Sequence, residues 1–294
     1  MRHLWSLWLV LALAAPAAAD DFLGVRPLGT GGAHRAIVNG NDAIELNPAG
    51  MSQFQRYSLE LQYLLTPKFG ASDGEMEHVF HASVVDNQTQ PVATGLAYTR
   101  VERGGAKAGN RFDLATSYPI SENVILGTDI YYINFDRDGK EDAVDAVTVD
   151  VGVLVHTAIG LNLAVVGYAL TNTGDYLEHP VSMAAGVSYA PFRTLQFGFD
   201  FFSNFQRPKD PANPTGEKES GFSYHFGAEY LALGQVTIRA GYTIDQARPG
   251  AEEQFWSAGA GWVSETVAVD FGYRGPISHG SWGGTFAFAL RLFM

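Results

Sequence analysis

The sequence predicts an all-β fold: a transmembrane, antiparallel, up-and-down β-barrel of about fourteen strands with a short N-terminal plug in its lumen. Three observations predict this fold. Apolar and polar residues alternate in steps of two over most of the 294 residues, and the connections between these segments alternate between longer and shorter. The N-terminus has the pattern of a secretory signal peptide. One short segment near the N-terminus departs from the period of two, and we expect it to form a small helix within the plug.

The N-terminal residues predict export. A short positive region at Arg2 and His3 precedes an apolar run, and three alanines at 17–19 form a small-residue cleavage site before Asp20. The apolar run is shorter than the roughly 20 residues that a membrane-spanning helix needs. We therefore expect three segments: a signal peptide at 1–19, an N-terminal plug or hatch segment at 20–55, and a transmembrane β-barrel at 56–294.

Composition excludes several classes of protein. The chain has no cysteine, which excludes disulfides and thiolate chemistry, and its net charge of −12 argues against nucleic-acid binding, which needs clustered lysine and arginine. No second apolar run is long enough for a membrane-spanning helix. A β-barrel remains compatible, because its strands are apolar only at alternate positions.

Alternation defines the strands. In the segment TVAVDFGYR at 266–274, valine, phenylalanine and tyrosine occupy one face, while Ala268, Asp270 and Gly272 occupy the other. Most segments are close to the nine to eleven residues with which a tilted strand crosses a bilayer. A barrel of twelve strands is the alternative, if 111–119 or 160–170 pairs differently. The predicted strands are 56–65, 77–86, 91–101, 111–119, 122–135, 145–157, 160–170, 180–190, 194–203, 220–231, 235–245, 254–263, 266–274 and 283–294.

The connections are sorted by length. The longer ones are TPKFGASDG, ERGGAKAG, RDGKEDA, NTGDYLEH, NFQRPKDPANPTGEKES, DQARPGAEE and RGPISHGSW, and the short ones are DNQTQ, PISEN, TAIG, APFRT, LALGQ and VSE. Long outside loops and short periplasmic turns are typical of outer-membrane barrels, whereas a soluble β-sandwich has no reason to sort its loops in this way. The last strand is apolar at every second position to the C-terminus, which resembles the signal that the outer-membrane assembly machinery reads.

The segment NGNDAIELNPAGM at 39–51 does not alternate. Asp42–Leu46 is compatible with a short helix, which Asn41 or Asp42 can cap. Pro48 disfavours the helical region for Asn47 and ends the helix. Gly50 then lets the chain turn towards the first strand. Because this segment need not cross the membrane, it is the predicted last part of the plug.

The order of short motifs at the N-terminus resembles the FadL-like superfamily of outer-membrane barrels, which includes PorV-type and TraF-like proteins. The motifs are RPLGTGGA at 26–33, NDA at 41–43 and NPAG at 47–50. The resemblance implies a monomeric fourteen-stranded barrel whose N-terminal segment folds inside the lumen as a plug. The residues that carry the plug motif are Arg26, Gly29, Gly31, Gly32, Asp42, Asn47, Pro48, Ala49 and Gly50.

The resemblance implies two functions. Members of the FadL branch are channels for the uptake of small hydrophobic molecules, fatty-acid-like or aromatic, by diffusion. The alternative is a PorV-like binding or scaffold protein that does not transport, with the loop 204–220 as the contact for a secreted or surface protein. An ion-conducting porin conflicts with the plug. The expected location is the Gram-negative outer membrane, and the expected partners are outer-membrane lipid and lipopolysaccharide, the assembly machinery and a hydrophobic small molecule.

Charged residues on the faces opposite the apolar ones are expected to point into the lumen, because charges on the lipid face cost about 2–4 kcal/mol at the bilayer midplane. They either fix the plug and the strand register or form a cation-favouring pathway, and Arg26 and Arg35 of the plug are expected to pair with lumen acids. Gly95 and Gly127 either mark weak points for lateral exit or make room for the plug backbone. The lumen charges are Glu60, Asp113, Asp129, Asp150, Asp200, Glu229, Arg239, Asp270, Arg274 and Arg291.

Enzymatic motifs are absent from the sequence. Neither H-E-x-x-H nor G-x-S-x-G occurs, and His78 and His81 are spaced so that a strand places them on opposite faces. We therefore expect no catalytic residues, no metal site and no cofactor.

Overall fold

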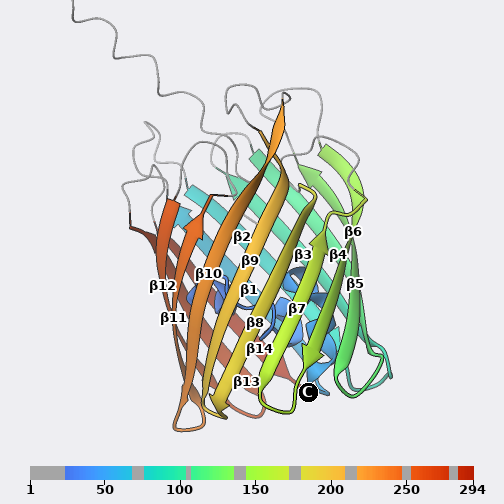
Figure 1. Cartoon of the computed structure of the whole chain (residues 1–294), viewed down its shortest axis with the longest axis vertical. Helices are drawn as coiled ribbons and strands as arrows, with labels where there is room; N and C mark the ends of the chain where they lie inside the picture. The colour runs from blue at the N-terminus through green and yellow to red at the C-terminus, as the bar shows by residue number, and fades with distance from the viewer. Residues whose placement is uncertain are drawn as a thin grey trace, which may run out of the picture.

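The chain forms a closed barrel of fourteen antiparallel strands (Figure 1). The computed structural model describes residues 24–67, 76–103, 107–135, 144–171, 180–208, 217–246, 253–277 and 284–294. Each strand pairs with its neighbours in chain order, and β1 (Tyr57–Pro67) closes the barrel against β14 (Thr285–Phe293). The predicted fold class and strand number are confirmed, and the twelve-strand alternative is wrong.

The remaining strands lie within a few residues of their predicted positions. Their lengths vary from eight residues in β7 to fifteen in β10. They are β2 (Met76–Asp86), β3 (Ala93–Arg103), β4 (Lys107–Pro119), β5 (Val124–Phe135), β6 (Val144–His156), β7 (Leu161–Tyr168), β8 (Ser182–Phe192), β9 (Leu195–Pro208), β10 (Lys218–Ala232), β11 (Val236–Asp245), β12 (Glu253–Val263) and β13 (Val267–Pro276).

The two faces of the wall are the reverse of those in a water-soluble protein. On β1, Leu61 is 52% exposed on the outer face, whereas Glu60 and Gln62 are buried on the inner face. On β14 the outer face carries a continuous row of phenylalanine and leucine. An apolar outer surface around a polar interior is what lipid on one side and a filled lumen on the other require.

The connections also follow the prediction. Short turns at 87–92, 120–123, 157–160, 193–194, 233–235 and 264–266 lie at one end of the barrel, together with the C-terminus (Figure 1). The other connections lie largely outside the described residues, as does the predicted signal peptide. One expectation was wrong: the connection predicted at 102–109 is mostly strand, because β3 runs to Arg103 and β4 starts at Lys107.

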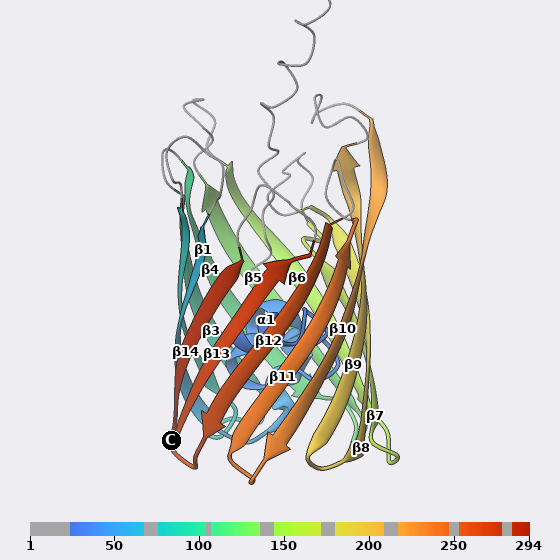
Figure 2. The ribbon, with the colours of Figure 1, turned by 90° about the vertical axis from the view of Figure 1, so that its left-hand side faces the viewer.

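The N-terminal segment lies inside the barrel (Figure 2). It contains α1 (Val25–Gly29), the 3-10 helix η1 (Gly40–Asp42), α2 (Ala43–Leu46) and the 3-10 helix η2 (Pro48–Gln53). The predicted helix is therefore present, whereas α1 and η2 were not predicted from the sequence. No helix among the described residues has the length and apolar character needed to span a membrane.

Asn47 separates the two halves of the predicted helix-and-break segment. Its backbone is extended, with φ −162° and ψ 97°, as the following Pro48 predicts. Its side-chain Oδ1 accepts a hydrogen bond from Ala49 N at 3.2 Å and starts η2. The predicted caps of α2 are wrong, because Asn41 and Asp42 make no cap hydrogen bond and turn instead to the barrel wall.

Candidate functional site: the plug and the cavity beside it

The plug, defined here as residues 24–56, touches all fourteen strands. Its backbone carbonyls accept from wall side chains: Ala36 O from Ser188, Ala49 O from Ser117, and Gly31 O from Thr243. α1 packs against β11 to β14, η1 against β1 and β2, and α2 with η2 against β3 to β6. Contacts to β7, β8, β9 and β10 come from the segment between α1 and η1. The plug therefore fills the cross-section of the lumen.

Glycines of the wall allow the plug to pack closely against the strands. A Cβ on Gly127 would lie 2.1 Å from Ala49 N, and one on Gly241 would lie 2.2 Å from the backbone N of Gly31. Gly31 itself has φ +64°, a conformation that favours glycine. Among the described residues, nine wall glycines would place an added Cβ within 3.2 Å of a plug atom: Gly95, Gly127, Gly152, Gly186, Gly198, Gly227, Gly241, Gly259 and Gly272.

This packing decides between the two alternatives for Gly95 and Gly127 and corrects the expectation for Gly50. Gly95 and Gly127 mark no weak point in the wall, because both pair with residues of the strands on either side in an uninterrupted register. They make room for the plug. Gly50 makes no turn towards β1; it lies within η2, where a Cβ would meet Val38 O at 2.4 Å.

Asp200 of β9 holds the middle of the plug. Its Oδ2 accepts from His34 N at 3.0 Å and Arg35 N at 2.9 Å, and lies 3.3 Å from Arg35 Nη1. The Arg35 Nε donates to the hydroxyl of Tyr168 at 2.7 Å, and its guanidinium lies over the rings of Tyr168 and Phe202. Asp200 and Arg35 are both buried. The structure thus places Arg35 against a wall acid, as expected.

Arg26 is different from Arg35. Its Nη1 donates to Asn39 Oδ1 at 3.1 Å and lies 3.8 Å from Asp42 Oδ2, so its acidic neighbour belongs to the plug itself and the expected pairing with a wall acid is not formed at Arg26. Asp42 instead connects the plug to the wall, because Arg291 Nη2 donates to its Oδ2 at 3.1 Å. Arg291 also contacts Glu60 of β1. These groups tie the plug to the seam where the barrel closes.

A third cluster of polar side chains is centred on Arg111, a residue that was not among the predicted lumen charges. Its Nε lies 2.6 Å from Asp113 Oδ1 and its Nη2 lies 3.1 Å from Asp129 Oδ2, while its guanidinium stacks 3.7 Å from the ring of Tyr131. Arg111 is two residues from Asp113 and therefore lies on the same face of the strand. This spacing could have identified Arg111 as a lumen residue from the sequence. The charged or hydrogen-bonding groups facing Glu45 of the plug include His81, Thr99, Arg111, Asp113 and Asp150.

Glu45 brings a carboxyl group from the plug into this acidic surrounding. Thr99 Oγ1 donates to its Oε1 at 2.9 Å, and Arg111 Nε lies 3.9 Å from the same oxygen. Burial, together with the nearby carboxyl of Asp113, raises the pKa of Glu45 to about 8 against the lowering effect of Arg111. Burial also lowers the pKa of His34 in the plug. Burial therefore favours the uncharged forms of both side chains, protonated Glu45 and neutral His34.

The remaining predicted charges also face the lumen. Arg239 contacts Glu229 through Nε and lies 2.6 Å from Asp270 through Nη1. Arg274 lies over the ring of Phe255 at 4.9 Å. Of the two histidines on β2, His81 is buried on the lumen side, whereas His78 lies on the other face against Tyr63.

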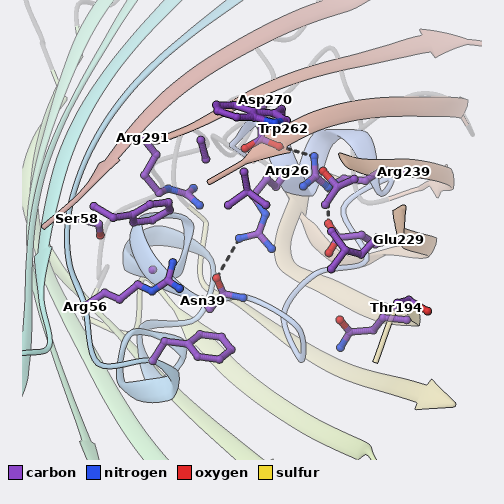
Figure 3. Close-up of a pocket in the computed structure, with 18 of the residues that line it drawn as sticks. Arg26, Asn39, Arg56, Ser58, Thr194, Glu229, Arg239, Trp262, Asp270 and Arg291 are labelled. Atoms are coloured by element: carbon purple, nitrogen blue, oxygen red, sulfur yellow. Dashed lines mark hydrogen bonds and ion pairs between the residues drawn. The ribbon is translucent and has the colours of Figure 1, made fainter. Parts of the chain in front are cut away.

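A cavity of about 390 Å³ lies between the plug and the short-turn end of the barrel (Figure 3). Its polar lining includes Arg26, Arg56 and Arg239. Its apolar lining comes from the plug, from β2, and from β8, β9, β10, β12, β13 and β14 near their short turns. The apolar residues that line it include Met51, Phe54, Val85, Phe192, Leu195, Leu231, Val263 and Phe293.

Comparisons with known proteins show the fold. No family model and no curated protein matches the sequence. Among solved structures, the CymD monoaromatic hydrocarbon channel is similar, with a TM-score of 0.67 and 15% identity over 92% of this chain and 97% of that chain. The Pseudomonas putida toluene transporter TodX gives 0.66 and 12% over 93% and 98%.

A Pseudomonas aeruginosa FadL homologue is also similar, with a TM-score of 0.61 and 12% identity over 92% of this chain and 97% of that chain. The chain therefore has the fold of FadL-type channels. The resemblance seen in the N-terminal motifs is confirmed at the level of the fold.

Proposed function

We propose that this chain, which has the fold of FadL-type channels, is an integral protein of the bacterial outer membrane through which small hydrophobic molecules diffuse towards the periplasm. The observation that carries the proposal is the plug seated across the lumen above a cavity with largely apolar walls. The structural neighbours named as monoaromatic hydrocarbon and toluene channels support the same class of substrate. The short turns are assigned to the periplasmic side by their length.

The mechanism needs binding and movement, without covalent chemistry. The plug contacts every strand, so a molecule entering from the long-connection side reaches the cavity only when plug contacts open. These contacts combine close packing against wall glycines with hydrogen bonds and ion pairs to Asp200, Arg111 and Arg291, among other wall residues. A path therefore opens when these contacts break and the plug moves within the lumen. Apolar side chains of the cavity then receive the molecule.

Uptake of radiolabelled toluene by cells tests the proposal. Host cells that lack their own hydrophobic channels should take up toluene faster with this protein in the outer membrane than with an empty vector. The matched control is a barrel of equal abundance with the plug tied to the wall. Equal uptake by cells with and without the protein, at confirmed surface abundance, would refute the proposed passage.

The scaffold function has one observation in its favour. The β9–β10 hairpin extends past its neighbours (Figure 2). β8 pairs with β9 only as far as Asn204, and β11 pairs with β10 only from Ser223, whereas β9 and β10 pair with each other up to Pro208 and Lys218. Purification in mild detergent followed by mass spectrometry separates the two functions. A bound hydrophobic molecule supports passage, and a stoichiometric protein partner supports a scaffold.

A further inference from the structure

The cavity beside the plug carries more positive charge at its rim than its ion pairs neutralise. Arg239 is held by Glu229 and Asp270. In the same way, Arg291 is held by two carboxylates, one from the plug and one from β1. These two arginines lie at the inner side of the cavity, and their charges are compensated within the wall and the plug.

Arg56 and Arg193 line the same cavity without such compensation, and Arg26 beside them is compensated only in part. Arg26 donates one hydrogen bond to the neutral amide of Asn39, forms an ion pair with Asp42 at 3.8 Å and interacts electrostatically with Glu229. The guanidinium of Arg56 lies 4.8 Å from the ring of Phe293. Within the described part of the chain, neither Arg56 nor Arg193 has a carboxylate within ion-pair distance. Each guanidinium offers five N–H donors, so most donors of Arg56 and Arg193 are available to a ligand.

The geometry directs two of these groups into the cavity. Figure 3 shows the side chains of Arg26 and Arg56 pointing into the space between the plug and the wall. Arg56 has the same strand parity as Ser58 and Glu60, which face the lumen. Arg193 joins them from the two-residue turn between β8 and β9. The cations thus come from three separate parts of the chain and meet at one opening.

Apolar side chains form much of the remaining lining, beside the polar Asn39, Ser58, Thr194, Gln196 and Thr237 and the ion-paired carboxylates of Glu229 and Asp270. Met51, Phe54, Phe192, Leu231 and Phe293 surround the space beside these cations. A volume of about 390 Å³ is more than twice the roughly 150 Å³ cavity in which benzene binds. The site therefore fits a compact molecule with an apolar body and one anionic head, because arginine matches the geometry of a carboxylate.

We propose that this cavity is a binding site for a compact amphipathic organic carboxylate, held by Arg26 and Arg56 with Arg193 at the rim. The inference deepens the proposed function, because it states what the short-turn end of the passage recognises. Neutral hydrocarbons would use only the apolar part of the site. The carboxylate would dwell longer, with its head at the rim and its body against the plug.

Binding of 2-naphthoate to the purified barrel in zwitterionic lipid nanodiscs tests the inference, with empty nanodiscs as background. We expect saturable binding of naphthoate that is about tenfold tighter than that of the neutral 2-naphthamide, as loss of one charge-assisted contact predicts. The double variant Arg56→Gln/Arg193→Gln should weaken naphthoate binding about tenfold and leave naphthamide binding unchanged. Both residues are exposed, so the fold should not depend on them.

The matched control is Arg100→Gln, which removes a half-exposed arginine at the opposite end of the wall and should leave naphthoate binding unchanged. Equal binding of naphthoate and naphthamide, or equal loss in the Arg100 and Arg56/Arg193 variants, would overturn the inference. These outcomes are independent of toluene uptake. Toluene uptake without selectivity for naphthoate would support the proposed passage and refute the carboxylate site. Selectivity for naphthoate without toluene uptake would support the carboxylate site and refute the passage.

Discussion

Replacing Asp200 with alanine should release the middle of the plug from the wall. The carboxylate accepts two backbone N–H groups and the Arg35 guanidinium, all buried. Breaking a buried ion pair by removing one partner costs about 3–5 kcal/mol. A loss of about 4 kcal/mol corresponds to an increase of roughly 10³ in the equilibrium constant for local opening of this part of the plug, at 1.4 kcal/mol per factor of ten.

Thiol labelling measures this opening directly, because the chain has no cysteine. A single Val38→Cys substitution places a thiol at a fully buried plug position. When opening and closing are faster than labelling, the maleimide reaction rate follows the opening equilibrium. Asp200→Ala should therefore speed labelling about a thousandfold. Asp200→Asn keeps an acceptor but loses the charge, so its effect should be smaller, roughly ten- to a hundredfold.

Glu102→Ala is the control for a general effect of removing an acid. Glu102 is exposed and lies 3.5 Å from Arg100 on the outer part of β3, so labelling of the buried thiol should not change. If Asp200→Ala labels within threefold of the parent while the barrel remains folded, Asp200 does not hold the plug and the reasoning from its three contacts is wrong.

Three further predictions concern the plug seat and the lipid face. Gly127→Val should expose the Val38→Cys thiol with the barrel still folded, because any Cβ at this position meets Ala49 N at 2.1 Å; unchanged labelling would contradict the close fit. The pKa of Glu45 is raised from 4.5 to about 8, so its contribution to stability is complete below about pH 4.5 and is lost as the pH rises through about 8. The Tm of the parent in detergent should therefore fall between these two pH values. The Tm of Glu45→Gln should change less over the same range. Leu61→Arg should destabilise the barrel in bilayers by about 2–4 kcal/mol in urea titration, whereas Leu61→Val should have little effect.

The barrel could be predicted from the sequence because its signal is repeated in every strand. A period of two with an apolar face recurs fourteen times, and each strand needs only local information to be recognised. The glycines at positions such as 152, 227, 241 and 272 lie on the polar face of this pattern. Their role in admitting the plug could not be predicted, because it depends on which backbone lies opposite in the lumen.

The plug was only partly predictable for the same reason. The Asp42–Leu46 helix and the break at Asn47 have local causes, and both are present. The short helices α1 and η2 are held by packing, which local propensity does not reveal. Arg26 and Arg35 looked equivalent in sequence. Only the folded chain shows that Arg35 reaches a wall acid whereas Arg26 lines the cavity.

The central claim is that small hydrophobic molecules cross this barrel when the plug moves. A disulfide between Asn41→Cys and Ser58→Cys would tie the plug to β1, at a place where the two side chains face each other and Ser58 Oγ donates to Asn41 Oδ1 at 2.6 Å. Its formation is verified by loss of free thiols, and the two single-cysteine chains are the controls. Toluene uptake by cells should fall to the empty-vector rate when the pair is oxidised and return on reduction. Uptake that stays at the reduced rate with the disulfide fully formed would contradict the claim.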